Sequence, residues 1–212
     1  AMRIDVVKDV ATDLLSSVNG VNVGLMRFNF QEGGPIIHAM EDIDTARAPM
    51  TKTIDTLLPD GYTPLSETLY EAGLYFMGGL EDYGDVNDPD SSVVASKDPS
   101  NLARYNSPID LACQKNFVVL LTDGAPTRDS SADSKITSLS GYSAATGNAS
   151  CTGSGDGRCL DDMAAYLYES DLSPLPGKQN VVTYTIGFTT NLPILDETAT
   201  RGGDRKSTRL NS

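Results

Sequence analysis

The sequence of 212 residues contains no tryptophan, one histidine and three cysteines, and it has only 16 Lys and Arg residues against 29 Asp and Glu. The formal net charge of −13 argues against a nucleic-acid backbone or an anionic membrane surface as partner. The charge is compatible with binding of cations or of a basic protein surface. No apolar run of about 18 residues occurs, so no membrane span is predicted. The 39% of hydrophobic residues suffice for the core of one moderate-sized domain.

No signal peptide is predicted within these residues, because the first three residues lead directly into a helical pattern. We therefore expect the chain to be part of a longer protein. Hydrophobic periodicity predicts helices over residues 3–18, 45–58, 64–76, 160–169 and 191–200, and strands over residues 21–30, 35–43, 117–121 and 180–188. This order predicts an α/β domain with a doubly wound, mostly parallel sheet.

The most informative stretch is KNFVVLLTDGAPT, residues 115–127. Residues 117–121 are apolar on both faces, which predicts a strand in the middle of a parallel sheet. Asp123 and Gly124 then end the strand. In open α/β sheets the ligand crevice lies beyond the carboxyl ends of the strands, so Asp123 is placed for metal binding or catalysis.

A second specific stretch is GYTPL, residues 61–65. Thr63 precedes a proline and an apolar helical stripe, so it is predicted to be the N-cap of that helix, with Pro64 at the first helical position. Capping alone would account for this threonine.

Two segments are predicted to be irregular. Residues 80–114 form an insertion rich in Asp, Pro, Ser and Asn, and residues 128–159 form a loop rich in Ser, Gly and Ala. The insertion does not fit an EF-hand, because Val93 stands where glycine is needed and Pro99 where the bidentate glutamate belongs. We expect its aspartates to be solvated: Asp82, Asp85, Asp88 and Asp90.

Because the number of cysteines is odd, at least one of the three cannot form a disulfide within the chain. A disulfide between Cys151 and Cys159 is the preferred interpretation, because both lie in one short Gly/Ser-rich loop. Free thiols, or a bond from Cys113 to either of them or to a segment outside the chain, are the alternatives. Zinc is disfavoured, because there is no C-x-x-C pair and the only histidine, His38, is distant in sequence.

The two stretches around Thr63 and Asp123 resemble parts of a von Willebrand factor A domain. In that family, a metal-ion-dependent adhesion site combines a D-x-S-x-S loop, a threonine in a later loop and the aspartate of a T-D-G turn. The resemblance implies that Thr63 and Asp123 are ligands of Mg²⁺, or of Ca²⁺ or Mn²⁺. Asp60 and Asp129 lie nearby in sequence but match no family ligand.

A closer resemblance covers most of the chain. It rests on CQKNF at 113–117 before the T-D-G turn, CLDDMA and YLY at 159–168, TYTIGF at 183–188 and ATRGG at 199–203. These segments resemble the N-terminal A domain of PilY-type proteins, which are exported factors of the bacterial type IV pilus. The resemblance implies a metal-dependent adhesion module at the cell surface or pilus tip, reached through the periplasm. Its expected partners are pilus subunits or a protein ligand with an acidic group.

The chain departs from the family pattern at both ends. The D-x-S-x-S loop and the strand before it would precede Ala1, so we expect a partial domain over residues 1–203 that lacks its first strand. Residues 204–212 are polar and without periodicity, and they resemble translated cloning or adaptor sequence.

Two other functions fit parts of the sequence. One is a non-adhesive A-domain scaffold, such as the partner subunit of a metal chelatase. The other is a phosphatase with an aspartate nucleophile, but such enzymes need a second aspartate two positions away, and Leu121 stands there. We therefore predict a binding module and no enzyme.

Overall fold

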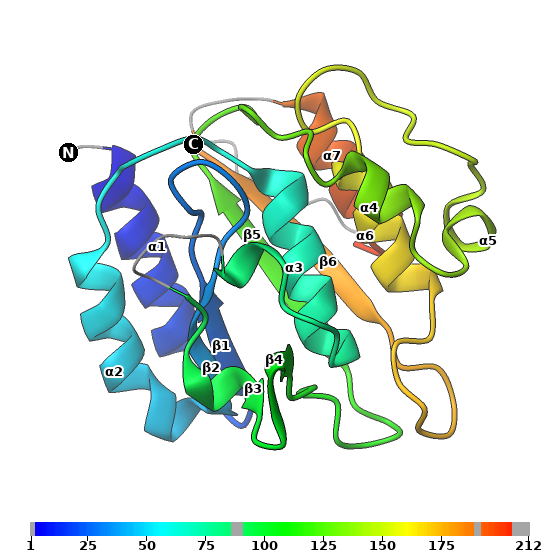
Figure 1. Ribbon diagram of the computed structural model, residues 1–212. Coiled ribbons are helices and arrows are strands. Elements are labelled where there is room, and N and C mark those ends of the chain that lie inside the picture. The colour runs from blue at the N-terminus through cyan, green and yellow to red at the C-terminus, as the bar shows by residue number, and fades with distance from the viewer. Residues whose placement is uncertain (1–2, 86–90, 189–191, 205–212) are drawn as a thin grey trace.

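A computed structural model describes residues 3–85, 91–188 and 192–204. Two helices, α1 (Arg3–Ser17) and α2 (Ile43–Thr56), lie side by side at one flank of the molecule (Figure 1). They pack on β1 (Asn22–Met26) and β2 (Ile36–Asp42), which form an antiparallel pair. The apolar stripes predicted from sequence meet here in a small core made of Leu15, Ile43, Ala46, Met50 and Ile54.

The larger core lies between a second strand pair and three helices. Strands β5 (Asn116–Thr122) and β6 (Val181–Gly187) run parallel in unbroken register. The helices are α3 (Leu65–Met77), α6 (Leu160–Glu169) and α7 (Pro193–Arg201). Helix α3 is buried along nearly its whole length, and α6 packs against α3, α7 and β6. All nine helices and strands named so far fall where the sequence predicted them, with ends shifted by a few residues.

Both segments expected to be irregular contain secondary structure. The insertion includes two short 3₁₀ turns, η1 (Tyr83–Asp85) and η2 (Val94–Ser96), and a hairpin of β3 (Lys97–Asp98) and β4 (Asn101–Tyr105). The second segment includes α4 (Asp133–Thr137) and α5 (Tyr142–Thr146). Asp82 is paired with Lys135 at 2.7 Å rather than only solvated. Asp88 and Asp90 lie outside the described residues, as does the tail after residue 204.

The predicted doubly wound, mostly parallel sheet is wrong. In the described residues the strands form three separate two-stranded sheets, β1–β2, β3–β4 and β5–β6, and only the last is parallel. No ladder joins β1 to β5. Periodicity indicates which faces of a strand are apolar, whereas the lateral hydrogen bonds that decide sheet order leave no trace in it.

The apolar run of strand β5 predicted burial on both faces, but only one of its faces is buried. Phe117 is 50% exposed and Val119 38% exposed, and Tyr184 of β6 lies 36% exposed beside them. In a parallel pair, residues in register point to the same side, so these side chains form one open apolar face. The opposite face, which includes Leu120, packs into the larger core.

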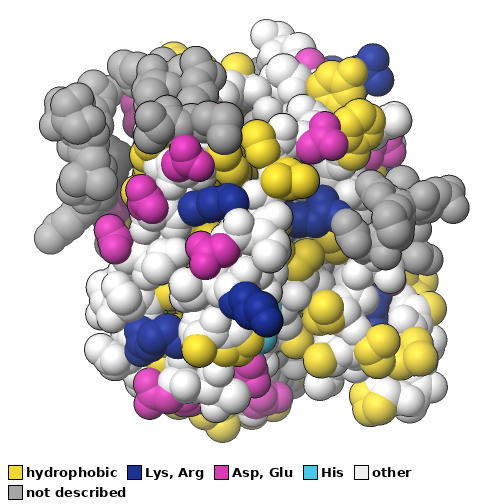
Figure 2. Space-filling model, turned by 90° about the vertical axis from the view of Figure 1, so that its left-hand side faces the viewer, with side chains coloured by type: hydrophobic (Ala, Val, Ile, Leu, Met, Phe, Trp, Pro, Cys, Tyr) yellow, Lys and Arg dark blue, Asp and Glu magenta, His cyan; other side chains and the backbone are white. Residues whose placement is uncertain are grey.

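The face that carries α1 and α2 shows basic and acidic side chains interspersed with hydrophobic ones (Figure 2). No extended basic surface gathers on the described part of this face, in keeping with the overall negative charge. Across the described ranges, none of the helices is both long and apolar enough to pass through a bilayer.

Candidate functional site

Three loops meet at one end of the molecule, beyond the carboxyl end of β5 and the amino end of α3 (Figure 1). We call this region, residues 27–35, 57–64 and 123–132, the loop edge. The amide of Tyr62 donates to the carbonyl of Phe30 at 2.9 Å. The amide of Thr63 donates to Oγ1 of Thr127 at 3.0 Å, and the amide of Thr127 donates to the carbonyl of Thr63 at 3.2 Å. Short backbone contacts therefore hold the three loops together.

Thr63 and Asp123, the two predicted metal ligands, both belong to this edge. The pairing of Thr63 with Thr127 brings the loop of Thr63 against the loop that starts at Asp123. Both residues are partly buried. Within the described part of the chain, neither the Thr63 hydroxyl nor the Asp123 carboxylate has a hydrogen-bond or ion-pair partner. Two oxygen ligands are thus available at adjacent loops.

The cap of helix α3 is not the residue that the local sequence pattern predicts. The Thr63 side chain does not cap the helix, contrary to the prediction, and the helix begins at Leu65 rather than at Pro64. The carboxylate of Asp129 caps the helix instead. It accepts from the amides of Ser66 (2.8 Å) and Glu67 (3.2 Å) and from the Ser66 hydroxyl (3.0 Å). Asp129 is fully buried.

Glu67 extends this network from the first turn of α3. One carboxylate oxygen accepts from the amide of Gly33 at 2.8 Å, and the other accepts from the amide (3.1 Å) and hydroxyl (2.7 Å) of Ser131. Asp156 in turn accepts from the amides of Arg128 and Asp129. The buried carboxylates of Glu67 and Asp129 and the exposed carboxylate of Asp156 thus hold the loops on both sides of α3 by their backbone N–H groups.

Burial raises the pKa of Asp129 to about 7, although its hydrogen bonds from Ser66 and Glu67 act in the opposite direction. Burial raises the pKa of Glu67 as well. A carboxyl whose pKa is raised on folding binds its proton more tightly in the folded state. Its contribution to stability is complete below the unfolded pKa of about 4 and is lost as the pH rises to about 7.

We therefore expect the free energy of unfolding to increase by on the order of 1 kcal/mol when the pH is lowered from 7.5 to 6. Urea denaturation at a series of pH values measures this. The Asp129→Asn variant should show a shallower increase, because its side chain does not titrate. An equal slope in both proteins would contradict the assignment.

Arg128 stands out in the same loop, because it is the non-glycine residue with a left-handed backbone among those described, with φ of 51°. Its amide donates to Asp156 at 3.0 Å, which holds this conformation. Its guanidinium stacks over the ring of Tyr62, 4.4 Å from the centroid, and Phe30 lies next to that ring at 6.3 Å. The loop edge therefore presents an exposed cationic and aromatic surface beside Thr63.

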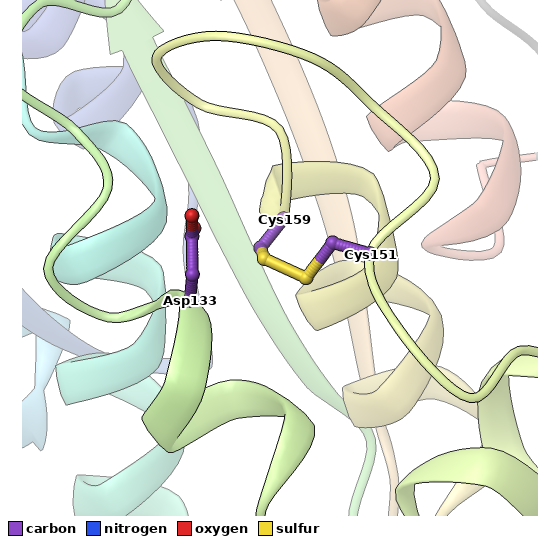
Figure 3. Close-up of side chains that lie close together, drawn as sticks. All are labelled: Asp133, Cys151 and Cys159. Atoms are coloured by element: carbon purple, nitrogen blue, oxygen red, sulfur yellow. A yellow bond between two sulfur atoms is a disulfide. The ribbon is translucent and has the colours of Figure 1, made fainter.

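The predicted disulfide between Cys151 and Cys159 is confirmed, with a Cα–Cα distance of 5.0 Å, and Cys113 is a free, exposed thiol. Beside the disulfide lies Asp133, at the start of α4 (Figure 3). Among the described residues, these three form the one close group of potential His, Cys, Asp or Glu metal ligands. Asp123 is thus not surrounded by further carboxylates within the described ranges.

Comparisons of the chain with protein-family models, with curated proteins and with solved structures found no match.

Proposed function

We propose that the chain is a cation-dependent protein-binding module, with its site at the loop edge. The observation that carries the proposal is the meeting of the Thr63 loop with the loop of Asp123, which leaves a hydroxyl and a carboxylate without partners. Free oxygen ligands at a loop junction are suited to a hard divalent cation. Mg²⁺ fits best, with Ca²⁺ or Mn²⁺ as substitutes.

The residues present fit such a cation only in part. Asp123 would supply one negative charge and Thr63 a neutral oxygen, whereas Mg²⁺ takes near-ideal octahedral coordination and keeps water where protein ligands are lacking. The buried carboxylates of Asp129 and Glu67 are already engaged by N–H donors and are not available as ligands. The cation should therefore bind weakly to this chain alone, and an acidic group of a partner would complete its coordination.

The surroundings of the site suit a protein partner. Arg128, Tyr62 and Phe30 provide charge and aromatic area, side-chain types that are enriched in protein interfaces. The sequence resemblance to PilY-type A domains supports a role in a type IV pilus-associated surface protein, in pilus biogenesis and attachment. A disulfide is compatible with export through the periplasm.

Binding to purified type IV pili tests this function. With millimolar Mg²⁺ the chain should be retained on immobilised pili, and chelation of the metal should release it. Asp123→Ala should reduce retention at least about tenfold, because removal of the only carboxylate of the site leaves the ion's charge uncompensated.

The matched control is Asp60→Ala, which removes an exposed carboxylate from the loop of Thr63 and should leave retention unchanged. Retention that persists in chelator, or that is equal for Asp123→Ala and the unmodified chain, would argue against the proposed site.

A further inference from the structure

A second potential metal site lies at the disulfide and shares no proposed ligand with the loop edge. One carboxylate oxygen of Asp133 and the sulfur atoms of Cys151 and Cys159 all lie within 4.8 Å of one another. Figure 3 shows the Asp133 side chain at the start of α4 beside the disulfide, whose Cys159 end joins the start of α6. Three side chains from separate segments thus converge on one small volume.

One oxygen atom of the Asp133 carboxylate is buried without a donor to satisfy it in the described part of the chain. Its Oδ2 accepts from Nε of Arg158 at 2.5 Å, but its Oδ1 is buried and has no hydrogen-bond partner among the described residues. The side chain is only 9% exposed. Buried carboxylate oxygens without a donor are costly and rare, so an atom that binds Oδ1 in another state of the protein would account for its placement.

The cysteines occupy an environment that favours thiolates. Cys159 is the N-cap residue of α6, where the positive end of the helix stabilises a thiolate and offsets the opposing effect of its full burial. The hydroxyl of Tyr142 lies 3.8 Å from the sulfur of Cys151 and donates a hydrogen bond to it. Cys151 itself is only partly buried, which leaves a route for a ligand from solvent.

We propose that the reduced form of this cluster binds Zn²⁺ through the two thiolates and the Asp133 carboxylate, with water in the fourth position. A dithiol reductant transfers two electrons and two protons to the Cys151–Cys159 disulfide and becomes a disulfide itself. Zinc then displaces both thiol protons to solvent and forms two Zn–S bonds. The Arg158 guanidinium and the zinc ion together balance the charges of the thiolates and the carboxylate.

Thiolate ligands set the choice of metal. Sulfur favours zinc over magnesium and calcium, and three protein ligands with one water is a usual zinc coordination. Because both sulfurs are tied up in the disulfide, the oxidised chain cannot bind zinc in this way. The site is therefore redox-controlled and independent of the oxygen site at Thr63 and Asp123.

Cobalt(II) titration tests the proposal, in a Cys113→Ser background that removes the third thiol. The chain is reduced with a phosphine, and Co²⁺ is added as a spectroscopic substitute for zinc. We expect thiolate-to-cobalt charge-transfer absorption and the strong visible bands of tetrahedral Co²⁺, and zinc should displace both. The oxidised chain should give neither signal.

Asp133→Asn should lower cobalt affinity by at least about tenfold, the lower bound for loss of even an outer partner of a zinc ligand. Asp60→Asn, which changes an exposed carboxylate of the loop edge, should leave the signal unchanged. If Asp133→Asn does not fold by circular dichroism, Cys151→Ser serves in its place and should abolish tight binding. Absence of charge transfer in the reduced chain, or unchanged affinity in the folded Asp133→Asn or the Cys151→Ser variant, would overturn the proposal.

Discussion

Replacing Asp129 with alanine should lower the free energy of unfolding by about 3 kcal/mol. Loss of a helix N-cap costs about 0.5 to 2 kcal/mol, and each buried donor left without an acceptor costs about 1 to 3 kcal/mol. Asp129 is fully buried and accepts from two amides and one hydroxyl of α3, so both effects apply. The same change removes a link between α3 and the loop after β5.

Urea denaturation followed by circular dichroism measures this loss. Asp129→Asn retains one acceptor oxygen and should fall between the unmodified chain and Asp129→Ala. Thr63→Ala is the informative comparison, because its hydroxyl does not cap the helix and its loss should cost less than about 0.5 kcal/mol. A larger loss for Thr63→Ala than for Asp129→Ala would show that the cap is misassigned.

Replacing Arg201 with alanine should cost about 3 to 5 kcal/mol, the range observed when one partner of a buried ion pair is removed. Its guanidinium is paired with Asp161 and with Asp162, the latter at 2.8 Å, and it donates to the carbonyl of Thr146 at 3.1 Å. The Asp162 side chain is fully buried and that of Asp161 is only 7% exposed. Without the arginine, α6 would begin with two adjacent carboxylates that lack an ion-pair partner, although the Thr152 amide would still donate to Asp162 at 2.9 Å.

Thermal and urea denaturation of Arg201→Ala should both show this loss. The matched control is Lys178→Ala, which breaks an exposed pair with Glu169 and should cost less than about 1 kcal/mol. Similar losses for the two variants would mean that the Arg201 pairs contribute no more than a surface ion pair.

The sequence predicted most helices and strands correctly, because their apolar periodicity is strong. The amphipathic pattern at the chain start predicted α1, and the β-branched run after residue 180 predicted β6. The sheet order could not be predicted in the same way. Phe117 and Val119 are as apolar as core residues, yet they lie on an open face, since the sequence does not show which neighbours cover a strand.

The candidate site was predicted only in part, for a related reason. Thr63 and Asp123 were identified from local patterns, and the structure places their loops side by side. Asp129 was missed, because its partners lie more than 60 residues earlier in the chain and no short-range pattern connects them. Its position shortly after strand β5 and the Asp123 turn was the one signal that could have drawn attention to it.

The disulfide was predicted from loop length and cysteine count, but its neighbour was not. Asp133 precedes Cys151 by 18 residues in a segment that the sequence analysis considered irregular, and α4 carries it to the sulfurs. Folding alone brings this carboxylate close to the two cysteines, so no fixed sequence spacing, such as that of C-x-x-C, could have predicted the group.

The most direct test of the cation site is paramagnetic broadening by Mn²⁺, which shares the oxygen preference of Mg²⁺ and reports weak binding. Amide NMR spectra of the ¹⁵N-labelled, oxidised chain would be recorded during the titration. We predict that broadening begins at Thr63 and in the turn after β5, that excess Mg²⁺ reverses it, and that Asp123→Asn abolishes it. Broadening spread over the acidic surface, or unchanged in Asp123→Asn, would contradict the cation site at the loop edge.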